Sequence, residues 1–266
     1  MRISVTGASG FIGSALCPVL RHAGHEVLAS DPRAGPTRGA QAVIHLAAIA
    51  HRSASVDELR RVNVDLTRQL GQAAAADGAS LVFLSSVKVH GEASHAPLTE
   101  SSAIAPADAY AESKARAEDA LRAIPGLQLT VLRPPLVYGP GVKANFLALM
   151  NAIARGMPLP LASIRNRRSL VSVANLVDAI RVCLSSEGTF LIADGEAQST
   201  PQLCRRIGEA LQRPARLFPF PVRLLPRKLA ASLEVDDSSI RRKVGWRAPV
   251  PVEEALRATA RWYHGR

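Results

Sequence analysis

The chain of 266 residues is long enough for one large α/β domain, or for a main domain with a smaller lobe. Hydrophobic residues make up 47% and charged residues 21%, which excludes a disordered chain. The net charge of +11 raises nucleic acid as a partner, but the basic residues are scattered and only 4% of residues are aromatic. We therefore expect no nucleic-acid partner.

Three widely spaced cysteines, Cys17, Cys183 and Cys204, show no metal-ligand spacing with each other or with histidine. They indicate buried free thiols in a reducing compartment, and no metal site. We expect no signal peptide, since Met1 leads straight into a strand, and the sequence holds no apolar run of about 18 residues that could span a bilayer. We expect a cytoplasmic protein without a membrane partner.

The N-terminal part predicts a β-turn-α-β unit. A strand is expected over 2–5, an amphipathic helix over 14 to about 23, and a second strand over 26–31. The first turn is Thr6-Gly7-Ala8-Ser9-Gly10-Phe11-Ile12-Gly13. Gly7 permits the bend, Gly10 lets a pyrophosphate approach the backbone, and Gly13 lets helix and strand pack. The helix N-terminus adds donors and a positive dipole for phosphates.

Asp31, at the end of the second strand, is placed to accept both hydroxyls of an adenosine ribose, which favours NAD. Arg33 and Arg38 follow closely and could pair with the 2′-phosphate of NADP instead. NAD is the preferred prediction, and NADP is not excluded.

Further elements follow a Pro/Gly/Arg-rich loop over 32–41. We expect a strand over 42–48, a helix from about 56 to 76 containing Asn63, and a strand over 81–84. The hydroxyls of Ser85 and Ser86 follow that last strand, at the edge where open α/β sheets bind ligands. His45 and His51 are interpreted as packing or surface residues.

A helix from Tyr110 to about Ala123 places Tyr110 and Lys114 on one face. An ammonium group beside a phenol stabilises the phenolate, so Lys114 should lower the pKa of Tyr110 and make it a proton donor and acceptor. A strand over 129–133 follows and breaks at Pro134-Pro135.

These motifs, in this order, resemble the extended short-chain dehydrogenases/reductases, in the NAD-dependent epimerase/dehydratase family that includes UDP-galactose 4-epimerase. The likeness rests on the glycine turn, on His45-Leu46-Ala47-Ala48, on Ser85-Ser86 before Val89-His90-Gly91, on Tyr110 to Lys114, and on Leu132 to Gly141. It spans nearly the whole chain.

The resemblance implies a Rossmann-type doubly wound parallel sheet with a small C-terminal substrate-binding lobe. Its catalytic residues would be Ser86, Tyr110 and Lys114. Its cofactor-binding residues would be Gly7, Ser9, Gly10, Phe11, Ile12, Gly13, Asp31, Arg33, Leu46, Ala47, Ala48, Asn63, Ser85, Tyr110, Lys114, Pro134 and Pro135.

The resemblance also implies a nucleotide-sugar substrate, such as a UDP-hexose. The residues that would bind it are Ser86, Lys88, Asn145, Phe146 and Arg168. Arg168 would grip the diphosphate, since a guanidinium suits a phosphate. Arg165 and Arg167 are interpreted as a solvated turn, and Arg223 and Arg227 are the candidates for a second diphosphate-binding arginine.

Two departures from the family pattern matter. Only about a dozen residues join the second strand to the next one, so the usual third strand is expected to be missing. Val87-Lys88 stands where hexose 4,6-dehydratases carry Asp-Glu, which argues against water elimination. We expect residues 1–141 and about 170–185 to form the cofactor domain, and 142–169 and about 186–266 to form the lobe.

The expected reaction is oxidation and reduction at C4 of a nucleotide-activated hexose. An epimerase and a 4-ketoreductase would use the same residues. Without the third strand the adenine pocket should be more open, which mildly favours a cofactor that exchanges and therefore a reductase. The alternative is a non-catalytic, nucleotide-sensing member of the fold. Alanines at 73–76 and 111–120 permit close helix packing, so we expect a homodimer through these helices.

Overall fold

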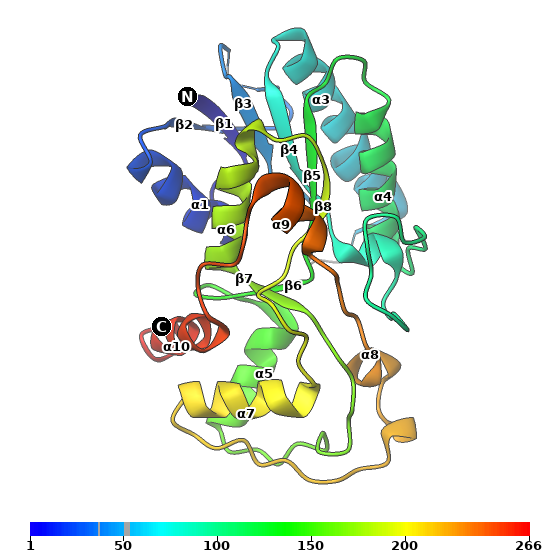
Figure 1. The fold of residues 1–266 in the computed structure, drawn as a ribbon, viewed down its shortest axis with the longest axis vertical. Coiled ribbons are helices and arrows are strands. Elements are labelled where there is room, and N and C mark those ends of the chain that lie inside the picture. The colour runs from blue at the N-terminus through cyan, green and yellow to red at the C-terminus, as the bar shows by residue number, and fades with distance from the viewer. Residues whose placement is uncertain (37, 51–53) are drawn as a thin grey trace.

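A parallel sheet with helices on both faces forms one part of the molecule, and a smaller lobe lies beyond the carboxyl ends of its strands (Figure 1). The structure is a computed structural model that describes residues 1–36, 38–50 and 54–266. Six strands pair in the order β2-β1-β3-β4-β5-β8, all parallel. They are β1 (Arg2–Thr6), β2 (Glu26–Ser30), β3 (Ala42–His45), β4 (Ser80–Leu84), β5 (Leu129–Arg133) and β8 (Gly188–Leu191). The predicted Rossmann-type fold is confirmed.

The short connection between β2 and β3 leaves the sheet without the extra strand that the family pattern adds. β1 pairs on one side with β2, where Ile3 is opposite Val27, and on the other side with β3, where Ile3 is opposite Ala42. β2 is therefore the edge strand of the described sheet.

Helices cover the sheet because each presents an apolar stripe to it. On one face lie α1 (Phe11–His22), α6 (Val173–Val182) and α9 (Ser238–Val244), and on the other lie α3 (Leu66–Ala76) and α4 (Ala109–Arg122) (Figure 1). The core under the first face includes Leu16, Leu176 and Ile240. The core under the second includes Leu70 and Leu121.

The helix expected over 56–76 is divided into three parts. α2 (Val56–Leu59) passes into a π-helical segment, η1 (Arg60–Asp65), before α3 begins at Leu66. Asn63 lies in the π segment and is buried. Such wide turns are frequent at functional sites, and hydrophobic periodicity does not reveal them.

The smaller lobe is built on a two-stranded parallel sheet and three longer helices. Its strands are β6 (Leu136–Tyr138) and β7 (Leu170–Ser172), and its helices are α5 (Ala144–Ala154), α7 (Thr200–Ala210) and α10 (Val252–His264). The short turns of the lobe are η4 (Val222–Leu224) and α8 (Arg227–Ala230), while η2 (Val87–His90) and η3 (Cys183–Ser185) lie beside the main sheet. The three helices share one apolar core, in which Phe146 stacks on Tyr138 with ring centroids 5.4 Å apart.

The chain packs on the main sheet over the expected segment, where Leu176 of α6 lies in its core, and also beyond that segment. The strand at Leu170 pairs with β6, while the sixth strand of the main sheet is β8, beyond the boundary expected near 185. α9 also returns, because Ile240 and Trp246 belong to the core of the main sheet. Short buried strands such as Gly188–Leu191 carry little periodic signal.

Candidate functional site

The turn from β1 into α1 has the close approaches that a dinucleotide-binding turn requires. Gly7 has a φ of +71°, and a Cβ atom there would lie 2.9 Å from the amide nitrogen of Ala47. A Cβ at Gly13 would overlap the carbonyl oxygen of Gly7. A Cβ at Gly10 would meet only that oxygen, at 3.2 Å, so its other side is open. This arrangement leaves room for a pyrophosphate at Gly10.

The N-terminus of α1 suits an anion. No side chain caps it, and its first turn carries no acidic residue. Ser9 is exposed beside it, whereas the side chains of Phe11 and Ile12 pack toward the hydrophobic cores. Phe11 and Ile12 would therefore serve a phosphate through their backbone N–H groups, which the helix dipole favours.

Asp31 and Arg33 lie just past the carboxyl end of β2, where the ribose contact was predicted. The amide of Arg33 donates to Asp31 Oδ1 at 2.9 Å, and its guanidinium lies 3.8 Å from Oδ2. Both side chains are largely exposed, so this ion pair costs little to open. The Asp31 carboxylate is therefore accessible to a ligand at the sheet edge.

His45 is a buried packing residue, as predicted. Its Nδ1 lies 2.6 Å from Thr6 Oγ1 and its Nε2 lies 2.8 Å from Thr67 Oγ1. Burial, with the nearby charge of Lys114, lowers the pKa of His45 to about 3. The ring is therefore neutral at physiological pH. His51 lies outside the described residues.

Asn63 holds the loop after β3 rather than offering a free amide. Its Oδ1 accepts from the amide of Ile49 at 2.8 Å, and its Nδ2 donates to Ile49 O at 3.1 Å and to Ser113 Oγ at 3.0 Å. Leu46, Ala47 and Ala48, the predicted cofactor contacts, immediately precede that loop. Asn63 thus ties them to the helix that carries Tyr110.

The end of β4 and the start of α4 are joined by contacts from two lysines. Lys114 Nζ donates to the carbonyl oxygen of Leu84 at 2.7 Å, two residues before Ser86. Ser86 Oγ accepts from the amide of Lys88 at 3.2 Å, and Lys88 Nζ pairs with Asp108 at 2.9 Å. Asp108 caps the helix that carries Tyr110. The structure thus brings together the elements that carry the three predicted catalytic residues.

The predicted effect of Lys114 on the tyrosine is wrong for the chain by itself. Burial, with the charge of Asp108 adding to it, raises the pKa of Tyr110 to about 12. Burial lowers the pKa of Lys114 to about 7. Its Nζ lies 4.4 Å from the centre of the Phe83 ring, in addition to its bond to Leu84 O. The tyrosine is therefore a neutral phenol at neutral pH.

A buried charge cluster behind the site was not predicted. Glu118, one turn after Lys114, receives hydrogen bonds from Ser85 Oγ (2.5 Å), Arg133 Nε (3.0 Å) and Arg133 Nη2 (2.5 Å). Arg133 Nη1 also donates to His90 Nε2 at 2.9 Å. Burial opposes ionisation of Glu118, but the hydrogen bonds and charge of Arg133 hold its pKa below the usual value.

This cluster joins the elements that carry the predicted site. Glu118 comes from α4, Ser85 precedes Ser86, and Arg133 precedes the buried Pro134 and Pro135. Ser85 therefore faces the carboxylate, which makes it a support for its neighbour rather than a free cofactor contact. The available signal was a glutamate on the helix face of Lys114 and an arginine ending an apolar strand.

The predicted substrate residues do not all lie free in the lobe. Asn145 is exposed, whereas Phe146 is a core residue. Arg168 Nη1 donates to the carbonyl oxygens of Lys228 (2.9 Å) and Ala231 (3.0 Å). Only part of its guanidinium is thus left for a ligand. Lys88 is already paired with Asp108.

Other lobe residues divide into paired and unpaired groups. Arg167 forms a two-bond ion pair with Glu234, 2.8 Å at each contact, and Arg165 is exposed, which agrees with a solvated turn. Gln198, not predicted, exchanges backbone hydrogen bonds with Arg168. Its buried Oε1 has no partner among residues 1–36, 38–50 and 54–266. A ligand donor would satisfy it.

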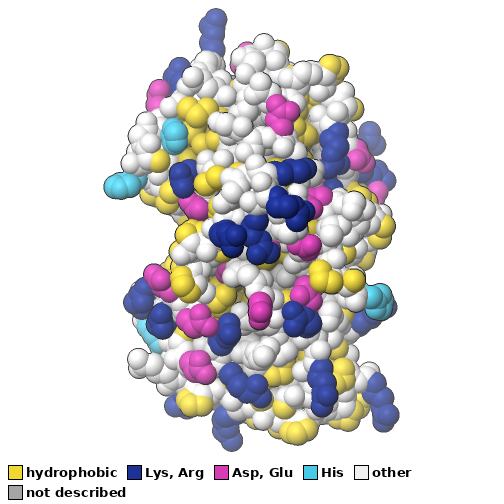
Figure 2. Space-filling model, viewed as in Figure 1, with side chains coloured by type: hydrophobic (Ala, Val, Ile, Leu, Met, Phe, Trp, Pro, Cys, Tyr) yellow, Lys and Arg dark blue, Asp and Glu magenta, His cyan; other side chains and the backbone are white. Residues whose placement is uncertain are grey.

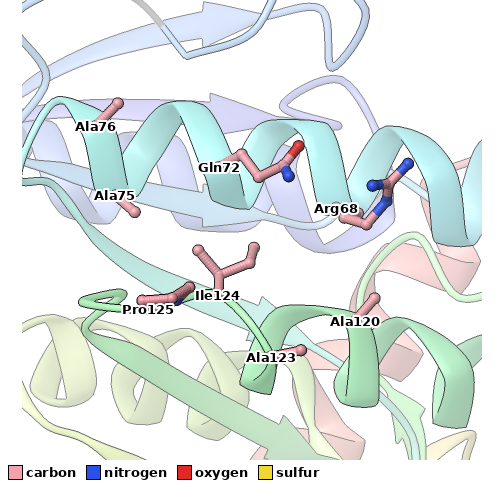
Figure 3. Close-up of a pocket in the computed structure, with 8 residues that line it drawn as sticks. All are labelled: Arg68, Gln72, Ala75, Ala76, Ala120, Ala123, Ile124 and Pro125. Carbon is pink, nitrogen blue, oxygen red and sulfur yellow. The ribbon is translucent and has the colours of Figure 1, made fainter.

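A groove lies away from these residues. It has a volume of about 520 Å³ and runs between α3 and α4 (Figure 3). Its lining consists of Arg68, Gln72, Ala75, Ala76, Ala120, Ala123, Ile124 and Pro125. It contains no group suited to redox chemistry, so it is not the candidate active site.

The described part of the chain contains no group of His, Cys, Asp and Glu residues arranged to hold a metal ion. No helix within it is long and apolar enough to cross a membrane. Cys17, Cys183 and Cys204 are buried and unpaired, which confirms the predicted free thiols.

Comparison with known proteins agrees with this geometry. The model of the NAD dependent epimerase/dehydratase family matches residues 3–40 and 34–193. A UDP-glucose 4-epimerase of Vibrio cholerae is 33% identical over 97% of this chain and 94% of its own length. A UDP-glucose 4-epimerase of Mycolicibacterium smegmatis is 27% identical over 100% and 99%. The UDP-glucose 4-epimerase of Thermus thermophilus, solved with NAD, superposes with a TM-score of 0.81 at 25% identity, over 100% of this chain and 99% of that one.

Proposed function

Because this chain belongs to the NAD dependent epimerase/dehydratase family, we propose that it oxidises and reduces C4 of a nucleotide-activated hexose, with NAD as the cofactor. The observation that carries the proposal is the buried Lys114. It is anchored at the end of the strand that leads to Ser86 and lies one helical turn after Tyr110. Two relatives named as UDP-glucose 4-epimerases, matched over nearly their whole length, support a UDP-hexose as substrate.

The chain's own residues suit a dinucleotide. The open side of Gly10 and the uncapped N-terminus of α1 would hold the pyrophosphate, and Asp31 would hold the adenosine ribose. A carboxylate at this position repels a 2′-phosphate, so NAD is favoured over NADP. The bound dinucleotide supplies hydride transfer to and from the sugar carbon.

The proton steps belong to Tyr110. Its phenol is neutral at pH 7, the form that donates a proton to a C4 ketone. In the opposite direction the phenolate takes the proton of the C4 hydroxyl, which requires the pKa of Tyr110 to fall when the site is filled. The Ser86 hydroxyl hydrogen-bonds the same oxygen. Lys114 would bind a ribose, and its protonated form, which is partly populated at neutral pH because burial lowers its pKa to about 7, would supply positive charge to this region.

An epimerase would return the hydride to the other face of the same sugar, and a reductase would release a reduced sugar. The open edge at β2, with no strand beyond it in the described sheet, favours an exchanging cofactor and so a reductase. The non-catalytic alternative does not explain why Ser86, Tyr110 and Lys114 are all present.

The test is a panel of UDP-hexoses and 4-keto UDP-sugars, monitored for C4 inversion and for cofactor oxidation by the loss of reduced-nicotinamide absorbance. Calorimetry with NAD(H) and NADP(H) runs beside it. We expect turnover of at least one sugar and tighter binding of NAD(H). Binding of neither dinucleotide would contradict the proposal, and binding without any turnover would favour the non-catalytic alternative.

We also propose a homodimer through α3 and α4. The small side chains that line the groove between these helices let a second pair of helices approach closely (Figure 3). Light scattering tests this, with twice the chain mass of 28.3 kDa expected. A monomeric mass at micromolar concentration would contradict it.

A further inference from the structure

The segment 217–230 exposes apolar side chains along one edge of the lobe, which ends at α8 near Glu92 of the main domain. Four of them are large and open to solvent: Phe218 (40% exposed), Val222 (37%), Leu224 (64%) and Leu229 (43%). Met157, 48% exposed, lies at the base of the same segment, because Arg216 Nη1 donates to the carbonyl oxygen of the adjacent Gly156 at 3.4 Å. We call residues 217–230 with Met157 the lobe rim.

The lobe rim is also strongly basic. The rim itself carries Arg223, Arg227 and Lys228, Arg213 and Arg216 lie just before it, and there is no acidic residue from Leu211 to Leu233. All five side chains are exposed. Lys228 lies 4.0 Å from Glu92, while the four arginines form no ion pair within the part of the chain that the structure describes. Figure 2 shows hydrophobic and basic side chains side by side at the lower end, where Figure 1 places the chain between α7 and α8.

The second half of the rim is fixed to the lobe. Asn166 Nδ2 donates to the carbonyl oxygen of Leu229 at 3.0 Å, and Arg168 Nη1 donates to that of Lys228 at 2.9 Å. Prolines at 219, 221 and 226 divide the segment into the short turns η4 and α8, so its side chains project outward from a held backbone. The exposed side chains thus project from a fixed backbone next to Arg168, the predicted diphosphate-binding arginine.

We propose that the lobe rim docks on an anionic lipid bilayer surface. Apolar side chains interleaved with cations are the pattern of proteins that lie in the headgroup region of a membrane. Each exposed cation near such a surface is attracted by the acidic headgroups, and each apolar side chain gains by entering the boundary with the acyl chains. A contact of this kind needs no spanning helix. A second copy of the chain fits poorly, because a two-fold contact would set these cations against each other.

Docking by the rim would hold the substrate lobe against the membrane, with Arg168 next to the attached segment. The enzyme would then take up or release its sugar diphosphate at the bilayer surface. This inference does not depend on the proposed reaction, since vesicle binding is measured without substrate or cofactor.

The test is co-sedimentation of the full chain with phosphatidylcholine vesicles, with and without about 30% phosphatidylglycerol. We expect binding to the anionic vesicles only, weakening as salt is raised. Leu224→Ser and the double variant Arg223→Ser, Arg227→Ser should each reduce the bound fraction about tenfold. The matched control, Arg242→Ser with Lys243→Ser, removes two exposed charges from α9 and should change binding less than about twofold.

Three results would overturn the proposal. They are no binding to anionic vesicles, an equal loss in the α9 control, and unchanged binding by Leu224→Ser. The second and third would mean that net charge alone attracts the protein. Specific capture of an acidic protein by the rim, without vesicle binding, would assign the surface to a protein partner instead. Circular dichroism melts confirm that each variant is folded.

Discussion

The cofactor domain has a buried, paired set of charged residues, whereas the substrate lobe has a set that is exposed and unpaired within the described chain. Behind the candidate active site, Glu118 and Arg133 are both buried and satisfy each other, and hydrogen bonds link them to Ser85 and His90. On the lobe, the arginines from 213 to 227 are exposed and without ion pairs among the described residues. The first arrangement fixes the backbone around the chemistry. The second leaves charge available to something outside the molecule.

The largest expected effect comes from breaking the buried pair. Glu118→Gln leaves the guanidinium of Arg133 buried without a counter-charge, and should lower the free energy of unfolding by about 3–5 kcal/mol. Urea denaturation measures it. Glu112→Gln, on the same helix in an exposed pair with Arg116, is the control and should cost less than about 1 kcal/mol. Equal effects would show that burial does not distinguish the two regions.

A smaller effect is expected at the contact between α3 and α4. A Cβ atom at Gly71 would lie 2.5 Å from Leu121 Cδ2 and 2.8 Å from Ile124 Cδ1, so Gly71→Ala should destabilise the fold by about 1–3 kcal/mol. Gln69→Ala, exposed on the same helix and outside the groove, should be nearly neutral. If Gly71→Ala were stabilising through its better helix propensity, the helices would be packed less tightly than described.

The pH dependence of stability should reveal the buried lysine. In the unfolded chain Lys114 keeps its proton up to about pH 10.5, while burial lowers its folded pKa to about 7. Between these values the unfolded state binds more protons, so stability rises with pH, by at most about 1.4 kcal/mol per unit. Lys114→Met should flatten this rise in urea midpoints between about pH 7.5 and 9.5. An unchanged slope would mean that Lys114 is charged in the folded state.

The smallest effect is expected on the lobe surface. Arg167 is exposed and pairs with Glu234, so Arg167→Met should change the free energy of unfolding by less than about 1 kcal/mol. Thermal unfolding checks this. If Arg167→Met lowered the free energy of unfolding as much as Glu118→Gln, exposed ion pairs of the lobe would matter as much for stability as the buried pair of the cofactor domain.

The same contrast explains which features were predictable from the sequence. The glycine turn, the positions of the first strands and the Tyr110–Lys114 spacing follow from local steric needs and from periodicity, and each is visible within a few residues. The Glu118–Arg133 cluster joins residues 15 apart in sequence through tertiary packing, so the glutamate and the arginine are each visible in the sequence but their contact is not.

The raised pKa of Tyr110 was missed for a related reason. Spacing places Lys114 on the right helix face, but it does not show that its ammonium bonds to Leu84 O, nor that Asp108 lies beside the phenol. In the lobe, the family resemblance marked Phe146 as a substrate contact, which stays a prediction, and it did not show that the ring stacks on Tyr138 in the core.

The central claim is that Tyr110 moves the proton in a C4 redox reaction. The most direct measurement is single-turnover hydride transfer with a UDP-hexose or its 4-keto form, comparing Tyr110→Phe with Tyr263→Phe. Tyr263 hydrogen-bonds Asn151 in the lobe and serves as the matched control. Tyr110→Phe should slow the step by about 10²–10⁴-fold while dinucleotide binding persists, and the control should keep its rate. Nearly unchanged hydride transfer in Tyr110→Phe would contradict the account.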